Sequence, residues 1–174
     1  MDANILLWIQ ENLRTPVLTP FFKGITALGN AGLIWIILSL ALLLFKKTRK
    51  TGILCACSLL GSLIINNLII KNLVGRIRPY EVISSLRVLI PFPHDTSFPS
   101  GHAGSSFAFA TVIFLTCKKR YGIAALVLAS FIAFSRLYLG VHYPTDVLCG
   151  SVFGIVIGAA TVAVSDYLSK RKVN

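Results

Sequence analysis

Three stretches of the chain, residues 24–45, 51–70 and 147–165, contain no charged side chain, and each has about the length of roughly 20 residues that a helix needs to cross a bilayer. Two shorter stretches, 103–117 and 121–135, reach that length only with the polar residues at their ends. Hydrophobic residues make up 55% of the chain and charged residues 13%, unlike a soluble globular protein. The sequence therefore predicts an all-α membrane protein, a polytopic bundle of about five transmembrane helices.

The expected helices leave little of the chain outside the bilayer. We expect spans near residues 24–45, 51–71, 100–117, 121–139 and 146–167, within a single domain of residues 1–174. Ahead of them, apolar side chains at positions 5, 6, 9 and 13 share one face of a helix, which predicts an interfacial helix within residues 1–22. The same pattern fits a packed connector, so residues 1–22 are open to more than one placement.

Basic residues mark one side of the expected bundle. They gather between the first two spans, between the third and fourth, and after the fifth, at Lys46, Lys47, Arg49, Lys50, Lys118, Lys119, Arg120, Lys170, Arg171 and Lys172. Lysine and arginine accumulate in short cytoplasmic loops, so we expect these three clusters in the cytoplasm and the loops 72–98 and 137–146 outside. They carry most of the +11 net charge, so topology explains the basic composition and no nucleic-acid partner is expected.

Four polar residues stand at the outward ends of four different expected spans: Lys71, His102, Arg136 and Asp146. Counting residues from the basic clusters along each helix places them roughly 24 to 36 Å from the cytoplasmic ends. Unrelated loop charges have no physical reason to share one level. We therefore expect a common pocket that opens at the level of the lipid headgroups.

The run Pro99-Ser100-Gly101-His102 falls where an outer loop becomes the third span. Ser100 is a good N-cap, and Gly101 lets a ligand come close to the backbone. The free amide groups and the positive dipole end of the helix favour an anion there. His102 would then reach an oxygen of the anion, although Ser-Gly-His at a helix start is also compatible with capping alone.

A second group of polar residues, Arg136, His142 and Asp146, follows later in the chain. His142 and Asp146 are four residues apart, which brings the carboxylate near the imidazole. A carboxylate bonded to one ring nitrogen fixes the tautomer and leaves the other nitrogen free to attack. The guanidinium of Arg136 offers a planar fork for phosphate oxygens. These residue types predict phosphate chemistry.

With a further element, Lys71 followed after six residues by Arg78-Pro79, the three motifs resemble those of the type 2 phosphatidic acid phosphatase family of integral-membrane lipid phosphatases. The motifs stand in the order and at the separations typical of the family. They occupy residues 71–146, which is under half of the chain. Many members carry six spans, whereas we expect five spans and an N-terminal segment that lies flat.

The resemblance implies a hydrolase that needs neither a metal nor another cofactor. His142 would attack phosphorus and form a phosphohistidine, and Asp146 would orient it. His102 would protonate the leaving oxygen and then activate water. The residues that would hold the phosphate oxygens are Lys71, Arg78, Ser100, Gly101 and Arg136.

An outward-facing pocket at headgroup level favours a lipid phosphate of a bacterial cell membrane, with the active site facing the outside or periplasm. Undecaprenyl diphosphate ranks first among the expected substrates. Phosphatidylglycerophosphate, phosphatidic acid and lipid A remain as alternatives. More remote readings are a non-catalytic lipid-phosphate carrier and a zinc hydrolase, whose metal the basic residues would repel. Oligomeric state is not indicated by any sequence pattern.

Other polar residues fit no element of the motifs, and we expect them to serve local structure. Arg76 and Arg87 are interpreted as interfacial anchors of helix ends. The pair His94-Asp95 is expected to be solvated in the long outer loop. Asn66-Asn67, inside the second expected span, is expected to hydrogen-bond a neighbouring helix.

Overall fold

The computed structural model describes residues 1–171, and Lys172 of the third basic cluster lies outside the described residues. All regular structure in residues 1–171 is helical, which confirms the expected fold class. The elements are α1 (Asp2–Asn12), α2 (Leu18–Gly29), η1 (Asn30–Gly32), α3 (Leu33–Leu44), α4 (Arg49–Ser62), η2 (Leu63–Ile70), α5 (Lys71–Val74), α6 (Pro79–Val82), α7 (Gly101–Thr116), α8 (Lys119–Tyr138) and α9 (Pro144–Arg171).

Four helical segments within the described chain are long and apolar enough to cross a bilayer: Leu18–Leu44, Arg49–Val82, Lys119–Tyr138 and Pro144–Arg171. The apolar helix α7 is shorter, with 16 residues, so the expected number of five spans stays a prediction. The first segment begins at Leu18 rather than near residue 24. Helix α2 therefore begins within the expected interfacial segment 1–22, and the placement of residues 18–22 relative to the membrane stays a prediction.

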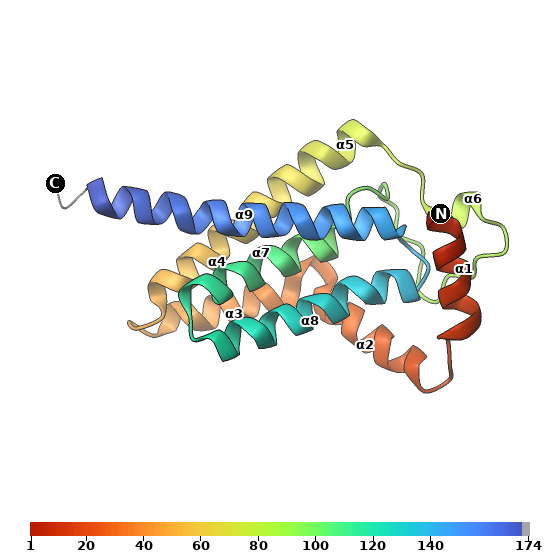
Figure 1. Ribbon diagram of the computed structural model, residues 1–174, viewed down its shortest axis with the longest axis horizontal. Coiled ribbons are helices and arrows are strands. Elements are labelled where there is room, and N and C mark those ends of the chain that lie inside the picture. Colours follow the sequence, from red (N-terminus) through yellow and green to blue (C-terminus); the bar gives the residue numbers. More distant parts are fainter. Residues whose placement is uncertain (172–174) are drawn as a thin grey trace.

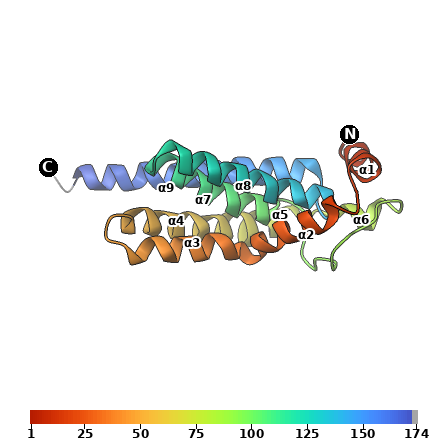
Figure 2. The ribbon, with the colours of Figure 1, turned by 90° about the horizontal axis from the view of Figure 1, so that it is seen from below.

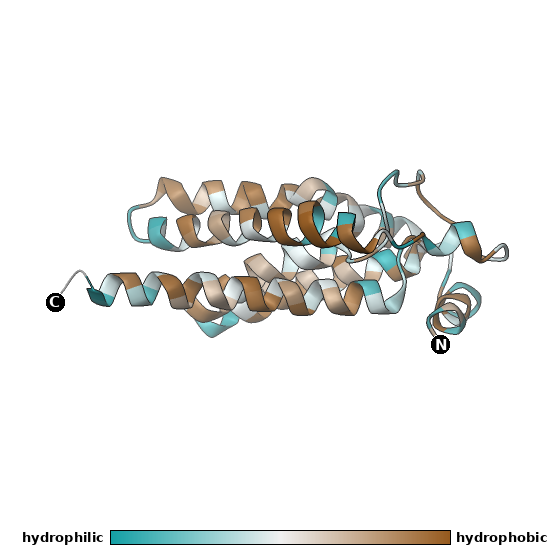
Figure 3. Cartoon of the chain, turned by 90° about the horizontal axis from the view of Figure 1, so that it is seen from above, coloured by the Kyte–Doolittle hydropathy of each residue, from teal (hydrophilic) through white to brown (hydrophobic). Residues whose placement is uncertain are grey.

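The helices run side by side, and their loops sort to two ends of the bundle (Figure 1). The α3–α4 loop, the α7–α8 loop and the end of α9 lie at one end, so the three basic clusters, as far as the structure describes them, gather there. Helix α1, α6 and the long loop before α7 lie at the other end (Figures 1 and 2). Hydrophobic residues cover the long helices between these ends, as expected for a surface that faces lipid (Figure 3).

Helix α7 lies at the centre of the bundle, where it packs against α4, α8 and α9. Its contact with α9 depends on glycines spaced four residues apart, which present a smooth helix face. A Cβ at Gly154 would lie 2.4 Å from the carbonyl oxygen of Gly104, and one at Gly150 would lie 2.6 Å from that of Ser100. The two backbones therefore touch, and this contact brings the start of α7 beside the start of α9.

Helix α1 packs its apolar face onto the end of the bundle. Leu6 and Ile9 are buried, and Ile9 packs with Tyr138 at the end of α8. The polar face is also used, because Arg14 Nε donates to the carbonyl oxygen of Tyr138 at 2.9 Å and Gln10 Oε1 accepts from the amide of Arg87 at 2.7 Å. The helix is thereby tied to the loops that form the site.

Candidate active site

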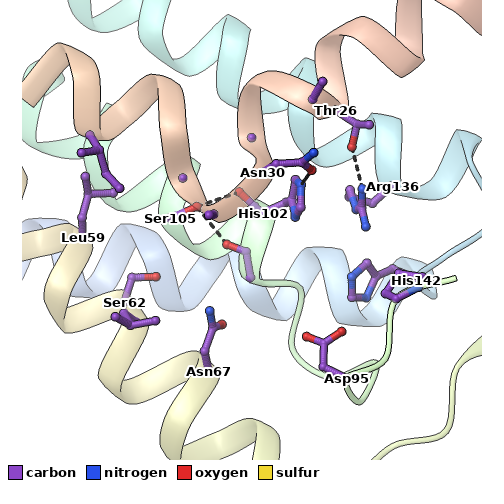
Figure 4. Close-up of a pocket in the computed structure, with 18 of the residues that line it drawn as sticks. Thr26, Asn30, Leu59, Ser62, Asn67, Asp95, His102, Ser105, Arg136 and His142 are labelled. Atoms are coloured by element: carbon purple, nitrogen blue, oxygen red, sulfur yellow. Dashed lines mark hydrogen bonds between the residues drawn. The ribbon is translucent and has the colours of Figure 1, made fainter. Parts of the chain in front are cut away.

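A cavity of about 1010 Å³ lies where α2, η1, η2, α7 and the outer loops meet, and Figure 4 shows residues that line it. Of the eight residues expected in the site, six line this cavity: Lys71, Arg78, Gly101, His102, Arg136 and His142. These residues come from three separate parts of the chain, residues 71–78, 101–102 and 136–142. The predicted common pocket is therefore present, and it differs in detail from the expectation for Ser100 and Asp146.

His142 lies in the loop between α8 and α9, with its ring almost fully buried. Its Nε2 is 3.4 Å from Nη1 of Arg78, and its Nδ1 is 3.5 Å from Oδ2 of Asp146. Burial lowers the pKa of His142 to about 3, and the charges of Arg136 and Arg78 act in the same direction. The imidazole is therefore neutral at ordinary pH, and its Nε2 is next to a basic side chain of the cavity.

Asp146 does not line the cavity but lies behind His142, and its side chain is fully buried. Its Oδ2 accepts hydrogen bonds from Ser97 Oγ at 2.5 Å and from the amide of Tyr143 at 2.9 Å. Its Oδ1 is held by Arg76 at 2.6 Å. These donors fix the carboxylate near Nδ1 of His142, as the sequence spacing predicted, although Nδ1 has no hydrogen-bond partner within the described residues.

His102 is on the first turn of α7, and its Nε2 is 3.1 Å from Oδ1 of Asn30 (Figure 4). Asn30 is at the break between α2 and α3, where Ala31 and Gly32 have positive φ angles of 50° and 70°. The break turns the chain so that Asn30 faces α7. Glycine adopts this left-handed conformation without steric cost, which explains why position 32 is a glycine.

Arg136, at the end of α8, is buried and donates from Nη1 to Oγ1 of Thr26 at 2.6 Å (Figure 4). Its Nε has no hydrogen-bond partner among the described residues. A buried guanidinium with a free donor is costly unless an anion completes its bonds. The cavity therefore has the electrostatics of an anion site.

Ser100 and Gly101 are neighbours in the sequence, but only Gly101 lines the cavity. Ser100 is buried and does not line the cavity, because its side chain caps α7 by accepting from the amide of Ala103. Ser100 is thus the N-cap that the sequence predicted, and its expected part in holding phosphate oxygens stays a prediction. Gly101 does line the cavity, and a Cβ there would lie 2.8 Å from Oδ1 of Asn67.

Asp95 is exposed, as the sequence led us to expect, but it also lines the cavity and pairs with two of its basic residues. Its carboxylate pairs with Nζ of Lys71 and with Nη2 of Arg78, the latter at 2.6 Å. Partial burial alone would raise the pKa of Asp95, but the hydrogen bonds and charges of Lys71 and Arg78 outweigh it and lower the pKa to about 2. Asp95 is thus paired with two of the four basic side chains that line the cavity, which are Lys23, Lys71, Arg78 and Arg136.

The cavity continues from its polar end into an apolar chamber between helices. The side chains that line this chamber are Ile36, Leu40, Leu59, Leu60 and Leu63. They belong to α3, α4 and the π-helix η2, which are parts of the segments long enough to cross a bilayer. The cavity can therefore hold a molecule with an anionic head and a hydrocarbon tail.

Some residues around the site were missed by the sequence interpretation. Arg76 binds Asp146, although it was interpreted as an interfacial anchor. A buried carboxylate needs a cation, and this requirement was the signal for an extra arginine near the motif. Thr26 and Asn30 gave no such signal, because each meets a partner more than 70 residues away in the sequence.

Asn66 and Asn67 also differ from one another. Nδ2 of Asn66 donates to Oγ of Ser62, four residues earlier in the same segment, at 3.1 Å. Asn67 lines the cavity instead.

In residues 1–171, no group of three or more histidine, cysteine, aspartate or glutamate side chains could hold a metal ion.

Comparisons with known proteins show which family this chain resembles in sequence and fold. A sequence profile described as the PAP2 superfamily matches residues 50–170. An undecaprenyl-diphosphatase of Sulfolobus acidocaldarius is 34% identical over 140 residues, covering 80% of this chain and 68% of the relative. A decaprenylphosphoryl-5-phosphoribose phosphatase of Mycobacterium tuberculosis is 34% identical over 167 residues, covering 94% and 90%. The crystal structure of a transmembrane PAP2 type phosphatidylglycerolphosphate phosphatase from Bacillus subtilis matches with a TM-score of 0.77 and 27% identity, covering 95% of this chain and 85% of that one.

Proposed function

The chain belongs to the PAP2 superfamily and is a multi-pass membrane lipid phosphatase, and we propose that it removes the terminal phosphate of a polyprenyl diphosphate through a phosphohistidine on His142. The observation that carries the proposal is a single cavity in which two histidines and the basic side chains of Lys71, Arg78 and Arg136 meet above an apolar chamber. The basic residues suit a phosphate group, the histidines suit its transfer, and the chamber suits a lipid chain.

The first step of the proposed reaction is attack by His142. Its imidazole is neutral, and its Nε2 lies beside Arg78, so a phosphate bound to Arg78 would present its phosphorus to the nitrogen lone pair. An N–P bond forms while the bond from phosphorus to the bridging oxygen breaks, and the lipid monophosphate leaves. Asp146 stabilises the positive imidazole that results, because its carboxylate faces the other ring nitrogen.

His102 is the proposed acid and base of the reaction. It gives a proton to the leaving oxygen in the first step and takes one from water in the second. The water oxygen attacks the phosphohistidine, which releases inorganic phosphate and restores neutral His142. Throughout, Lys71, Arg78 and Arg136 would balance the charge on the three outer oxygens of the transferred group, as positioned cations do in other phosphoryl transfers.

The choice of a polyprenyl diphosphate rests on the relatives and on the chamber. Two relatives with 34% identity act, by their names, on undecaprenyl and decaprenyl lipids. The apolar chamber accepts a hydrocarbon chain of either an isoprenoid or a glycerolipid. Phosphatidylglycerophosphate is the second candidate, because the solved relative from Bacillus subtilis is named for it. Phosphatidic acid and lipid A remain further alternatives.

We also propose that the cavity faces the outside or periplasm of a bacterial cell. The basic clusters of the described chain lie at the opposite end of the bundle from the polar end of the cavity, and basic loops favour the cytoplasm. A lipid diphosphate in the outer leaflet would then reach Lys71 and Arg78 with its headgroup.

A substrate panel tests the proposal. Purified protein in detergent micelles, with EDTA present, is given undecaprenyl diphosphate, phosphatidylglycerophosphate, phosphatidic acid or lipid A, and inorganic phosphate is measured. We expect the largest kcat/KM for undecaprenyl diphosphate and undiminished activity in EDTA. His94→Ala, which removes an exposed histidine of the outer loop, is the matched control for His142→Ala.

The outcomes separate the parts of the proposal. A larger kcat/KM for a glycerolipid would reject the polyprenyl substrate and keep the reaction. Loss of activity in EDTA would reject the metal-independent mechanism. Equal activity of His142→Ala and His94→Ala would reject His142 as the nucleophile.

A further inference from the structure

Arg76 contacts Asp146, the residue proposed to orient His142, although Arg76 belongs to no expected motif. Its Nη1 donates to Oδ1 of Asp146 at 2.6 Å and to Oγ1 of Thr145 at 2.7 Å. Its guanidinium also lies over the ring of Tyr143, with Cζ 3.9 Å from the ring centroid. Arg76 does not line the cavity, so it is not a further phosphate ligand.

The carboxylate of Asp146 depends on this contact. Asp146 is fully buried, and within the described residues Arg76 is the only lysine or arginine that forms an ion pair with it. A buried carboxylate without a cation is strongly unfavourable. Because Arg76 holds Oδ1, the other oxygen is turned toward Nδ1 of His142, 3.5 Å away.

The N-terminal helix α1 reaches the same cluster. Oδ2 of Asp2, on the first turn of α1, accepts from Nη2 of Arg76 at 3.0 Å and from Oγ1 of Thr145 at 2.5 Å. Asp2 therefore holds one terminal nitrogen of Arg76, and Asp146 holds the other. A continuous chain of contacts runs from Asp2 through Arg76 and Asp146 to His142.

We propose that Arg76 is a positioning residue of the phosphatase reaction, which holds Asp146 against His142, and that Asp2 holds Arg76 in turn. This proposal rests on the proposed nucleophilic role of His142. It gives the surface helix α1 a part in the reaction beyond attachment to the membrane. The same contacts make Asp146 available as an anion at the moment when His142 becomes positively charged.

Kinetics of Arg76 variants test the first half of the proposal. We expect Arg76→Ala to lower kcat about 10- to 100-fold, the size seen when outer partners of catalytic ligands are lost, with KM changed by less than about 2-fold. Arg76→Lys should keep more activity than Arg76→Gln, because the charge is retained. Since the Arg76 side chain is 31% exposed, millimolar guanidinium should restore part of the activity of Arg76→Ala. The matched control is Arg87→Ala, which removes an exposed arginine from the same outer loop.

A double-mutant cycle tests the second half. We expect Asp2→Asn to lower kcat several-fold and to add nothing further in the Arg76→Ala background, because both changes break one chain of contacts. If Asp2 served only to anchor α1, the two effects would multiply. A multiplied effect would overturn the role of Asp2.

The remaining outcomes are also decisive. A raised KM with unchanged kcat in Arg76→Ala would make Arg76 a substrate contact, and unchanged kcat and KM would remove it from the reaction. Should Arg76→Ala fail to fold, Arg76→Gln and Arg76→Lys carry the comparison, and equal kcat in these two would overturn the proposal. Failure of the proposed function is recognised separately, by activity that persists in His142→Ala.

Discussion

Single residues around the phosphate site are already paired before a substrate arrives. The carboxylate of Asp95 bridges Lys71 and Arg78, the same cations that are proposed to bind phosphate. A phosphate group must displace this carboxylate, and a group with two negative charges does so more readily than one with a single charge. Asp95 is half exposed at the cavity wall, so its side chain can swing away.

Asp95→Asn should strengthen inhibition by inorganic phosphate and orthovanadate. We expect the inhibition constants to fall about 3- to 5-fold, equivalent to roughly 1 kcal/mol for a partly exposed ion pair. The pKa of Asp95 is about 2, so the carboxylate is charged over the whole working range. The difference between wild type and Asp95→Asn should therefore persist from about pH 5 to pH 9.

Glu81→Gln is the charge-matched control, because Glu81 is an exposed acid of the same outer region. Its inhibition constants should equal those of the wild type. Weaker inhibition in Asp95→Asn would mean that Asp95 holds Lys71 and Arg78 in place for the substrate instead of competing with it.

Motif residues were the part of the site that the sequence could predict. Lys71, Arg78, Gly101, His102 and Arg136 meet at one cavity because each ends or begins a helix at the same level. The partners of these residues could not be predicted in the same way. Thr26 and Asn30 are ordinary polar residues of the first spanning segment, and only the packed fold brings them to Arg136 and His102.

Helices α7 and α9 form the contact on which the site depends. The amide of Ser100 donates to the carbonyl oxygen of Asp146 at 3.0 Å, so the starts of the two helices are joined directly. Gly154 permits this arrangement further along, where a Cβ would lie 2.4 Å from the carbonyl oxygen of Gly104. Backbone atoms cannot move aside as a flexible side chain can.

Gly154→Ala should therefore push α9 away from α7. The starts of these two helices, which carry His102 and Asp146, would then be held less firmly. We expect a loss of roughly 1–3 kcal/mol in stability, the usual cost of overpacking, together with lower kcat. Thermal unfolding of the purified protein in detergent, followed by size-exclusion chromatography, measures the first effect. Gly24→Ala is the control, since a Cβ at Gly24 meets nothing within 4 Å and should leave both quantities unchanged. Equal unfolding midpoints in the two variants would contradict the close contact.

At the level of helices, hydropathy predicted the segments but not their irregularities. The second spanning segment contains the π-helix η2, Leu63–Ile70, directly before Lys71. The first spanning segment is broken at Ala31 and Gly32. Hydropathy cannot reveal either feature, because both are backbone conformations that are set by packing against α7. The boundary at Leu18 was missed because Lys23 interrupts the apolar run that follows it.

For the whole molecule, we propose that the distribution of basic residues sets the orientation in the membrane. The loops that contain Lys47 and Lys118 lie at the end of the bundle opposite to α1 (Figure 1). In a background with the four native cysteines replaced, His94→Cys should react with a membrane-impermeant maleimide added to intact cells. Lys47→Cys should react only after lysis. The reverse pattern would place the active site in the cytoplasm.

Trapping the covalent intermediate tests the role of His142 most directly. Purified protein is mixed with undecaprenyl diphosphate labelled in its terminal phosphate, quenched in alkali and separated by denaturing electrophoresis. We expect a base-stable, acid-labile phosphoprotein in the wild type and in His94→Ala, and neither label nor turnover in His142→Ala. Label or turnover retained in His142→Ala would contradict a phosphohistidine at this position.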